Sequence, residues 1–168
     1  YTGDRSQRVY GKDNGSRQKV YFIFGSHRAF AWSTDMQNWT TFTNNINDDT
    51  KCQALFKSAF DWAAKGDSSY GWSGNLWAPD VIWNEQMNKW CMYMSINGKS
   101  WNSSIVLLTS DSLNGDWENQ GTVVYSGFTK SGVHAYTDTD FASVVGSDNA
   151  DAALVRFKSS GAFPVTVI

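Results

Sequence analysis

Residues 31–42 read AWSTDMQNWTTF, and residues 108–120 read LTSDSLNGDWENQ. Each stretch has Ser or Thr, then an Asp (Asp35 or Asp111), then a short polar turn and a Trp that opens a strand-like run. Such a repeat predicts successive antiparallel sheets of three or four strands, which is typical of the blades of a β-propeller. Two hairpin units of a β-sandwich would give the same pattern, and this alternative stays open here.

Runs rich in β-branched and aromatic residues surround both copies, as expected for strands. The predicted strands around the first copy are residues 19–24 (KVYFIF), 28–33 (RAFAWS) and 39–43 (WTTFT). Those around the second copy are residues 89–95 (KWCMYMS), 103–109 (SSIVLLT) and 117–125. Residues 152–157 and 163–168 are interpreted as two strands of a third unit.

Residues 55–64 (LFKSAFDWAA), between the two copies, carry apolar side chains at positions 55, 56, 59, 60 and 63. This spacing places them on one face of a helix, so one short amphipathic helix is predicted here. Gly66 follows at a suitable place for its end.

The composition excludes some classes of function. Fourteen Lys and Arg against sixteen Asp and Glu give a net charge of −2, which offers no electrostatic footprint for nucleic acid. No apolar run approaches the ~18 residues of a membrane helix, so no membrane partner is expected. Nine Trp either fill a core or present flat faces of the kind on which sugar rings stack.

Cys52 and Cys91 form at most one pair, their spacing matches no metal motif, and we expect free, buried thiols. His27 and His134 are the only histidines, which excludes a site of three histidines for zinc. No cofactor is predicted. The chain starts on Tyr1 with no leader-like segment, so a processed or truncated protein is expected.

Residues 74–83 (GNLWAPDVIW) start the strand that precedes residues 89–95. Pro79 suits the first position of a strand, where its missing N–H does no harm. The ordered set of FGSH (24–27), the Ser-Thr-Asp turn with its Trp (33–39), LWAPD (76–80), TSDS with its Trp (109–117) and VVYSGF (123–128) resembles glycoside hydrolase family 43. The resemblance is to its endo-arabinanase and arabinofuranosidase group, and it runs from about residue 20 to about residue 128.

This resemblance implies a five-bladed β-propeller with an active site at one end of its channel, of which the chain would form an incomplete part of two to two and a half blades. The expected organisation is a first blade over about residues 1–45, the helical insertion at 46–73, a second blade at 74–127 and the start of a third at 128–168. The family inverts the anomeric centre, using an Asp as general base, a Glu as general acid and a second Asp that orients the acid. Inversion needs room for a water molecule, so base and acid stand ~6.5–9.5 Å apart.

By the same resemblance, Asp4 in Gly-Asp-Arg-Ser corresponds to the general base, although the usual His and Pro are absent. Asp151, in Asn-Ala-Asp-Ala, corresponds to the orienting Asp, with Ala in place of Pro. Neither Glu85 nor Glu118 falls where the acid belongs, which the resemblance implies lies beyond residue 168. Each Asp is also compatible with an ordinary structural position, Asp4 in a solvated terminus and Asp151 in a polar turn.

His27, Trp77 and Asp80 are the candidate substrate-binding residues, expected near the mouth of the channel. The predicted function is inverting hydrolysis of α-L-arabinofuranosyl linkages in arabinan or arabinoxylan, by a secreted protein acting on plant cell-wall polysaccharide. A structural ion in the channel is a family possibility that the residues do not indicate. The alternatives are a Trp-rich carbohydrate-binding module and an inactive truncated propeller, whose open edges a homo-oligomer could cover.

Overall fold

The computed structural model describes residues 8–9, 18–99, 102–126, 134–140 and 143–144. Asp4, Asp151 and the strands predicted over residues 152–168 lie outside these residues, so they stay predictions. None of the helices in the described part is long and apolar enough to cross a membrane.

The first copy of the repeat forms a three-stranded antiparallel sheet, in the order β3-β4-β5. Its strands are β3 (Tyr21–Gly25), β4 (Ala29–Ser33) and β5 (Thr40–Thr41). Just before it, β1 (Arg8–Val9) pairs with β2 (Gln18–Lys19). The strand predicted over residues 39–43 is therefore correct in place but shorter than expected.

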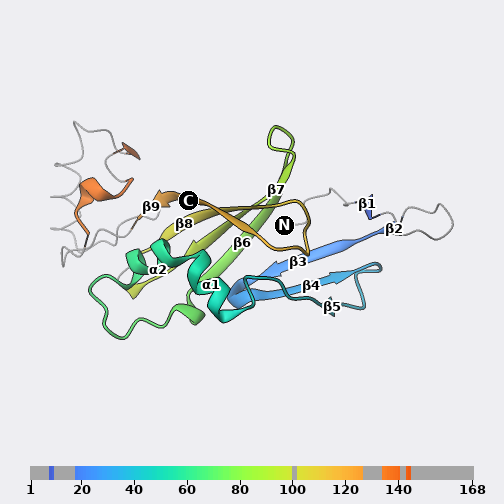
Figure 1. Cartoon of the computed structure of the whole chain (residues 1–168), viewed down its shortest axis with the longest axis horizontal. Helices are drawn as coiled ribbons and strands as arrows, with labels where there is room; N and C mark the ends of the chain where they lie inside the picture. The colour runs from blue at the N-terminus through green and yellow to red at the C-terminus, as the bar shows by residue number, and fades with distance from the viewer. Residues whose placement is uncertain (1–7, 10–17, 100–101, 127–133, 141–142, 145–168) are drawn as a thin grey trace.

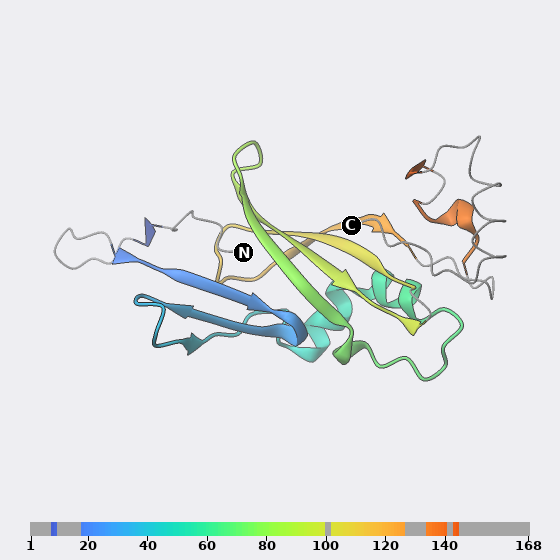
Figure 2. The ribbon, with the colours of Figure 1, turned by 180° about the vertical axis from the view of Figure 1, so that it is seen from behind.

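The second copy forms a four-stranded antiparallel sheet, in the order β6-β7-β8-β9. Its strands are β6 (Leu76–Asn84), β7 (Lys89–Ile96), β8 (Ser104–Ser110) and β9 (Glu118–Tyr125). Figures 1 and 2 show the tip of the β6–β7 hairpin projecting away from the rest of the ribbon. The predicted repeat of antiparallel sheets is thus confirmed.

In the turns that follow β4 and β8, the structurally equivalent residues are two serines, not the two aspartates that the sequence pattern matched. Ser33 ends β4 and Ser110 ends β8; both are buried, and each hydroxyl accepts the backbone N–H two residues later at 3.2 Å. Asp35 caps the first turn: hydrogen bonds from Asn38, then from Gln37 and Ser33, hold the pKa of its carboxyl well below the ordinary value. Asp111, which the sequence pattern matched to Asp35, instead forms an ion pair with Lys89 at 3.2 Å.

The insertion holds two helices, so the prediction of one short helix was incomplete. They are α1 (Asp49–Leu55) and α2 (Lys57–Ala64). Asp48 caps α1 by accepting the N–H of Lys51 at 2.9 Å, while only Cys52 is buried along its length. With a single buried residue, α1 shows no apolar periodicity to read from sequence. Gly66 follows α2 with φ +77°, as a helix end favours.

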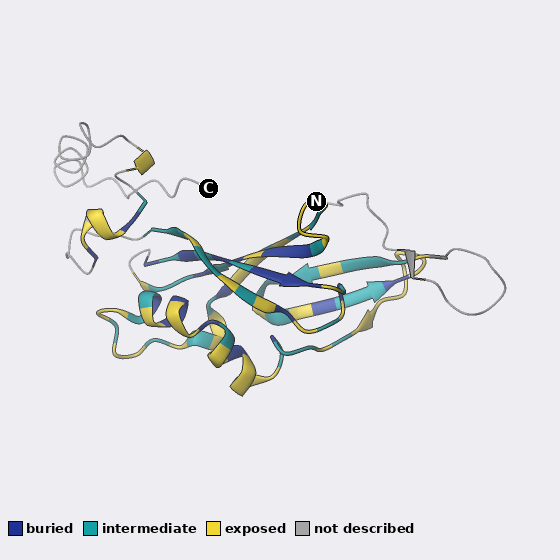
Figure 3. Ribbon diagram, turned by 45° about the horizontal axis from the view of Figure 1, so that its top comes forward, coloured by how far each residue is buried: buried dark blue, intermediate teal, exposed yellow. Residues whose placement is uncertain are grey.

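The core lies between the two sheets and beneath the helices. Phe24, Phe30 and Phe42 of the first unit pack together, and Phe24 meets Trp117 edge to face with ring centroids 6.1 Å apart. Along β7, Trp90, Met92, Met94 and Ile96 are buried on the face that α2 covers, and Cys91 is buried as well. Figure 3 shows the buried residues concentrated in the sheet while the helices expose their outer faces. Cys52 and Cys91 are free and buried, as predicted.

The segment of residues 134–140, with the short helix η4 (Tyr136–Asp138), returns to α2 and β9. The His134 ring stacks on Trp62 with centroids 3.6 Å apart and planes 6° apart. Asp140 holds Tyr125 twice, its carboxylate accepting the Tyr125 N–H at 2.6 Å and its own N–H donating to the Tyr125 carbonyl at 2.9 Å. His134 is buried and its Nδ1 has no partner, so burial lowers the pKa of the imidazole.

Asn45 joins the two copies of the repeat. Its amide donates to the Trp117 carbonyl at 2.8 Å and accepts the Trp117 N–H at 2.9 Å, as a neighbouring strand would.

We predict that Asn45→Ala lowers the free energy of unfolding by about 1–3 kcal/mol, because both backbone groups of a buried residue lose their partner. Urea titration measures this. Asn114→Ala, at an exposed turn position, is the control and should change it by less than about 0.5 kcal/mol.

Protonation of His134 should weaken the folded state. Its pKa is lower folded than unfolded, so its contribution to stability is present above pH ~6.5 and is lost as the pH falls below that value. We expect the stability difference between the native protein and His134→Phe, which keeps a stacked ring without titrating, to shift against the native protein between pH 7.5 and pH 5. A difference that stays constant over this range would contradict the prediction.

Candidate functional site

A tight turn, η1 (Ser26–Arg28), joins β3 to β4 in a left-handed backbone conformation. His27 has φ +58° and Arg28 has φ +69°. A left-handed conformation costs a residue other than glycine about 1–2 kcal/mol, so the surroundings must hold it. Of the five such residues with positive φ in the described part, three meet at this place: His27, Arg28 and Ala78. Clusters of backbone strain are found preferentially at functional sites.

Ala78 lies in a β-bulge of β6, where the pairing with β7 shifts between Trp77 and Asp80. Its N–H donates to the Ser26 hydroxyl at 2.9 Å, which ties the bulge to the turn. Pro79, the next residue, has no N–H to lose in the irregular ladder. Pro79 was expected at the first position of the strand, but β6 begins at Leu76 and the proline belongs to the bulge.

The bulge places Trp77 and Asp80 on one face of the sheet. Trp77 pairs with Ser95 and Asp80 with Tyr93, and residues two apart on β7 point to the same side. Without the extra residue, side chains three apart would point to opposite faces. Trp77, Asp80 and Tyr93 are all exposed, so this face presents two aromatic rings and a carboxylate to solvent.

His27 and Trp77 are in contact. Their ring centroids are 4.5 Å apart with planes at 70°, and the indole N–H of Trp77 donates to the Gly74 carbonyl at 3.1 Å. Trp77 remains 42% exposed, so part of its ring is open to a ligand. The structure thus brings two predicted residues together and sets Asp80 on the face that Trp77 occupies. Sequence reasoning missed Ser26, Arg28 and Tyr93, which stood within the quoted runs FGSH, RAFAWS and KWCMYMS but were not singled out.

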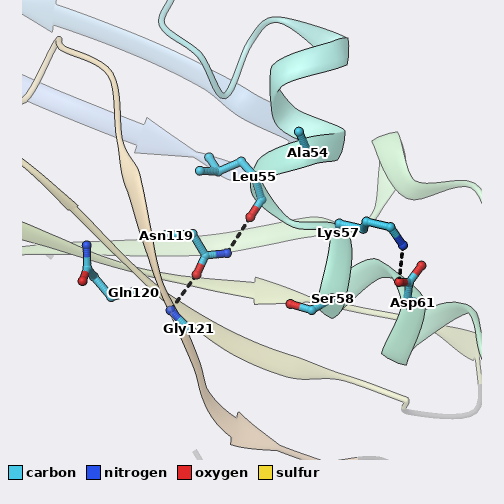
Figure 4. Close-up of a pocket in the computed structure, with 8 residues that line it drawn as sticks. All are labelled: Ala54, Leu55, Lys57, Ser58, Asp61, Asn119, Gln120 and Gly121. Atoms are coloured by element: carbon cyan, nitrogen blue, oxygen red, sulfur yellow. Dashed lines mark hydrogen bonds and ion pairs between the residues drawn. The ribbon is translucent and has the colours of Figure 1, made fainter.

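An open groove of about 530 Å³ lies on another part of the molecule, between the helices and β9 (Figure 4). Its lining residues are Ala54, Leu55, Lys57, Ser58, Asp61, Asn119, Gln120 and Gly121. It offers no aromatic platform, its Lys57 and Asp61 pair with each other at 2.5 Å, and β9 is the strand farthest from β6 in the sheet. The junction of η1 and β6 is therefore the better candidate.

The two glutamates lie away from this junction. Glu85 follows the last residue of β6 in the hairpin turn, and Glu118 begins β9, at the edge of the sheet opposite β6. Within the described residues, no group of three or more His, Cys, Asp or Glu side chains is placed to hold a metal ion.

Two relatives share sequence with the chain. It is 28% identical over 132 residues to extracellular endo-α-(1→5)-L-arabinanase 2 of Bacillus subtilis, covering 75% of this chain and 26% of that protein. It is 24% identical over 112 residues to the extracellular endo-α-(1→5)-L-arabinanase of Thermotoga petrophila, covering 64% of this chain and 22% of that protein. The chain therefore spans about a quarter of the length of these relatives. No protein-family model matches it.

Solved structures agree in fold. The family 43 glycoside hydrolase YxiA of Bacillus licheniformis superposes with a TM-score of 0.52 at 34% identity, covering 64% of this chain and 24% of that one. The Thermotoga petrophila endo-1,5-α-L-arabinanase superposes with a TM-score of 0.54 at 24% identity, covering 67% and 24%. The similarity to glycoside hydrolase family 43 that the sequence predicted is confirmed over this part of the chain.

The strain at Ala78 can be tested directly. Ala78→Gly should leave the free energy of unfolding unchanged or raise it by up to about 1 kcal/mol, since glycine adopts φ +44° without the cost that alanine bears. Ala54→Gly, in the exposed face of α1, should instead lower it by about 1 kcal/mol. Thermal unfolding of both variants measures the sign of each change in the free energy of unfolding. A clear loss of stability in Ala78→Gly would refute the backbone strain at Ala78.

Proposed function

We propose that this chain forms part of a secreted glycoside hydrolase that binds arabinan and hydrolyses its α-L-arabinofuranosyl linkages with inversion. The observation that carries the proposal is the strained junction that presents Trp77, braced by His27, beside Asp80. An exposed indole offers the flat apolar face that sugar C–H groups contact, and a nearby carboxylate can accept bonds from sugar hydroxyls. The names of the two relatives support arabinan as the substrate and an extracellular location.

In this proposal, His27, Trp77 and Asp80 bind the polysaccharide, Asp4 acts as general base and Asp151 orients the acid. The general acid comes from outside these 168 residues, because Glu85 and Glu118 lie away from the junction. Its carboxyl must keep a proton at neutral pH, and a neighbouring carboxylate raises a pKa in that direction. The proposed chemistry requires no cofactor.

We further propose that the two sheets are the first two blades of a five-bladed propeller. The blades and the insertion have the boundaries predicted above, and residues 128–168 start a third blade. Ile82 and Val123 stay exposed on the second sheet, and Ile23 on the first, which is expected of apolar side chains that a neighbouring blade would cover. A homo-oligomer that covers these faces is an alternative to further blades. Light scattering separates the two, since a dimer or larger species favours self-association.

Trp77 provides the sharpest test of binding. We expect Trp77→Ala to weaken binding of α-1,5-linked arabino-oligosaccharides about tenfold, or ~1.4 kcal/mol, by loss of the stacking surface. Trp39→Ala is the matched control, because Trp39 is 38% exposed against 42% for Trp77 but lies beside β5. Isothermal titration measures both. Equal losses in the two variants, or none in Trp77→Ala, would exclude the junction as the binding site.

A carbohydrate-binding module is the second candidate, favoured by the exposed Trp77 and by a junction where the described residues place Asp80 without a second carboxylate. Release of reducing sugar from debranched arabinan separates the two proposals, provided that it is measured on a protein that joins these 168 residues to the segment supplying the proposed general acid. Turnover that Asp4→Ala abolishes would favour the hydrolase, whereas tight binding with no turnover under any condition would favour the module or an inactive propeller.

A further inference from the structure

Arg28 joins the strained turn to the start of the helical insertion. Its guanidinium Nη1 donates to the Asp49 carboxylate at 2.7 Å, and the same nitrogen lies 3.4 Å from the Asn47 carbonyl and 3.5 Å from the Ile46 carbonyl. The Arg28 side chain is only 18% exposed, against 70% for Asp49. The Arg28 end of this pair is therefore sheltered from solvent while the Asp49 end is exposed, and a single side chain contacts three of the four residues 46–49 at the start of α1.

The backbone of Arg28 is held as well as its side chain. The Asn47 amide donates to the Arg28 carbonyl at 2.8 Å, which returns the bond that the guanidinium makes to Asn47. The guanidinium also lies over the Trp72 ring, 5.1 Å from its centroid, where a cation is attracted by the π-system. Trp72 belongs to η2 (Trp72–Gly74), which leads directly into β6.

These contacts act on the residue that the proposed site needs. His27 precedes Arg28 and shares its left-handed conformation, and such a pair persists only where the surroundings hold it on several sides. On one side, the turn is held by the hydrogen bond between the Ser26 hydroxyl and the N–H of Ala78 in β6. On the other side, the turn is held by the contacts of the Arg28 guanidinium with Ile46, Asn47 and Asp49. The His27 ring reaches Trp77 only if the turn keeps this shape.

We propose that Arg28 is a positioning residue of the oligosaccharide site: by tying the turn to residues 46–49 and to Trp72, it holds the His27 ring against Trp77. It touches no substrate itself. The ligand is the arabino-oligosaccharide of the proposed function, so this inference rests on that function for its ligand but not for its geometry. A lysine carries the charge but has neither the planar fork nor the stacking surface of the guanidinium, so it restores the contacts only in part.

The test uses four variants of the full chain. Arg28→Met removes the charge, Arg28→Lys keeps it, and Asp49→Asn weakens the ion pair from outside the turn. Lys89→Met is the matched control: it breaks an ion pair of comparable length, 3.2 Å to Asp111, at the far end of β6 and β7. Two ring signals report position without any ligand, namely the indole N–H resonance of Trp77 and the imidazole resonances of His27, each assigned by substitution of its residue.

We expect Arg28→Met to shift both ring signals and to weaken binding of an α-1,5-linked arabino-oligosaccharide about tenfold, at a temperature where the variant is fully folded. Arg28→Lys and Asp49→Asn should shift the same signals in the same direction by less, and Lys89→Met should shift neither. If Arg28→Met fails to fold, Arg28→Lys and Asp49→Asn decide alone.

Unchanged ring signals in the Arg28 variants, or a loss of thermal stability with native ring signals and native affinity, would overturn the positioning role. If the native protein binds no arabino-oligosaccharide, the proposed function fails, while the ring signals still decide whether Arg28 positions His27 against Trp77.

Discussion

The contact between Phe24 and Trp117 is the one on which the rest of the structure depends. It joins the aromatic cluster of the first sheet to a buried tryptophan that precedes the last strand of the second. Asn45 secures that tryptophan by pairing with both of its backbone groups. With the two sheets fixed in this way, β3 lies against β6, and the turn that ends β3 meets the bulge that interrupts β6.

The candidate site is a product of this meeting. Three residues adopt left-handed conformations there, and each is held by a neighbour from another segment of the chain. Ser26 accepts the N–H that the bulge releases, and Arg28 binds the start of the helical insertion. As a result, Trp77 is exposed and the His27 ring beside it is held in place. Fixing an aromatic ring before a ligand arrives lowers the entropy lost on binding, which is the physical advantage of building a site on strained but well-held backbone.

The helical insertion has a structural role that its sequence only partly reveals. The apolar stripe of α2 packs on β7 and β8, and this face was predictable from its spacing. The α1 helix has one buried residue and an Asp48 cap, so its sequence shows no apolar periodicity from which a helix could be predicted. Its importance lies in position, because Asp49 at its first turn meets Arg28, 21 residues earlier in the chain. A long-range contact of this kind leaves no local trace in the sequence.

The sequence by itself determined the strands of the two sheets, their repeat, the amphipathic helix and the resemblance to glycoside hydrolase family 43, because these depend on short-range periodicity and on ordered motifs. It also indicated His27, Trp77 and Asp80. Only the tertiary structure decided that His27 touches Trp77 and that a bulge, which includes Pro79, turns Asp80 to the same face as Trp77. Only the tertiary structure showed that Ser33 and Ser110 are the equivalent residues of the two turns. The reason is that a one-residue bulge reverses the direction of every following side chain, and the packing of distant segments, rather than local preference, sets where it occurs.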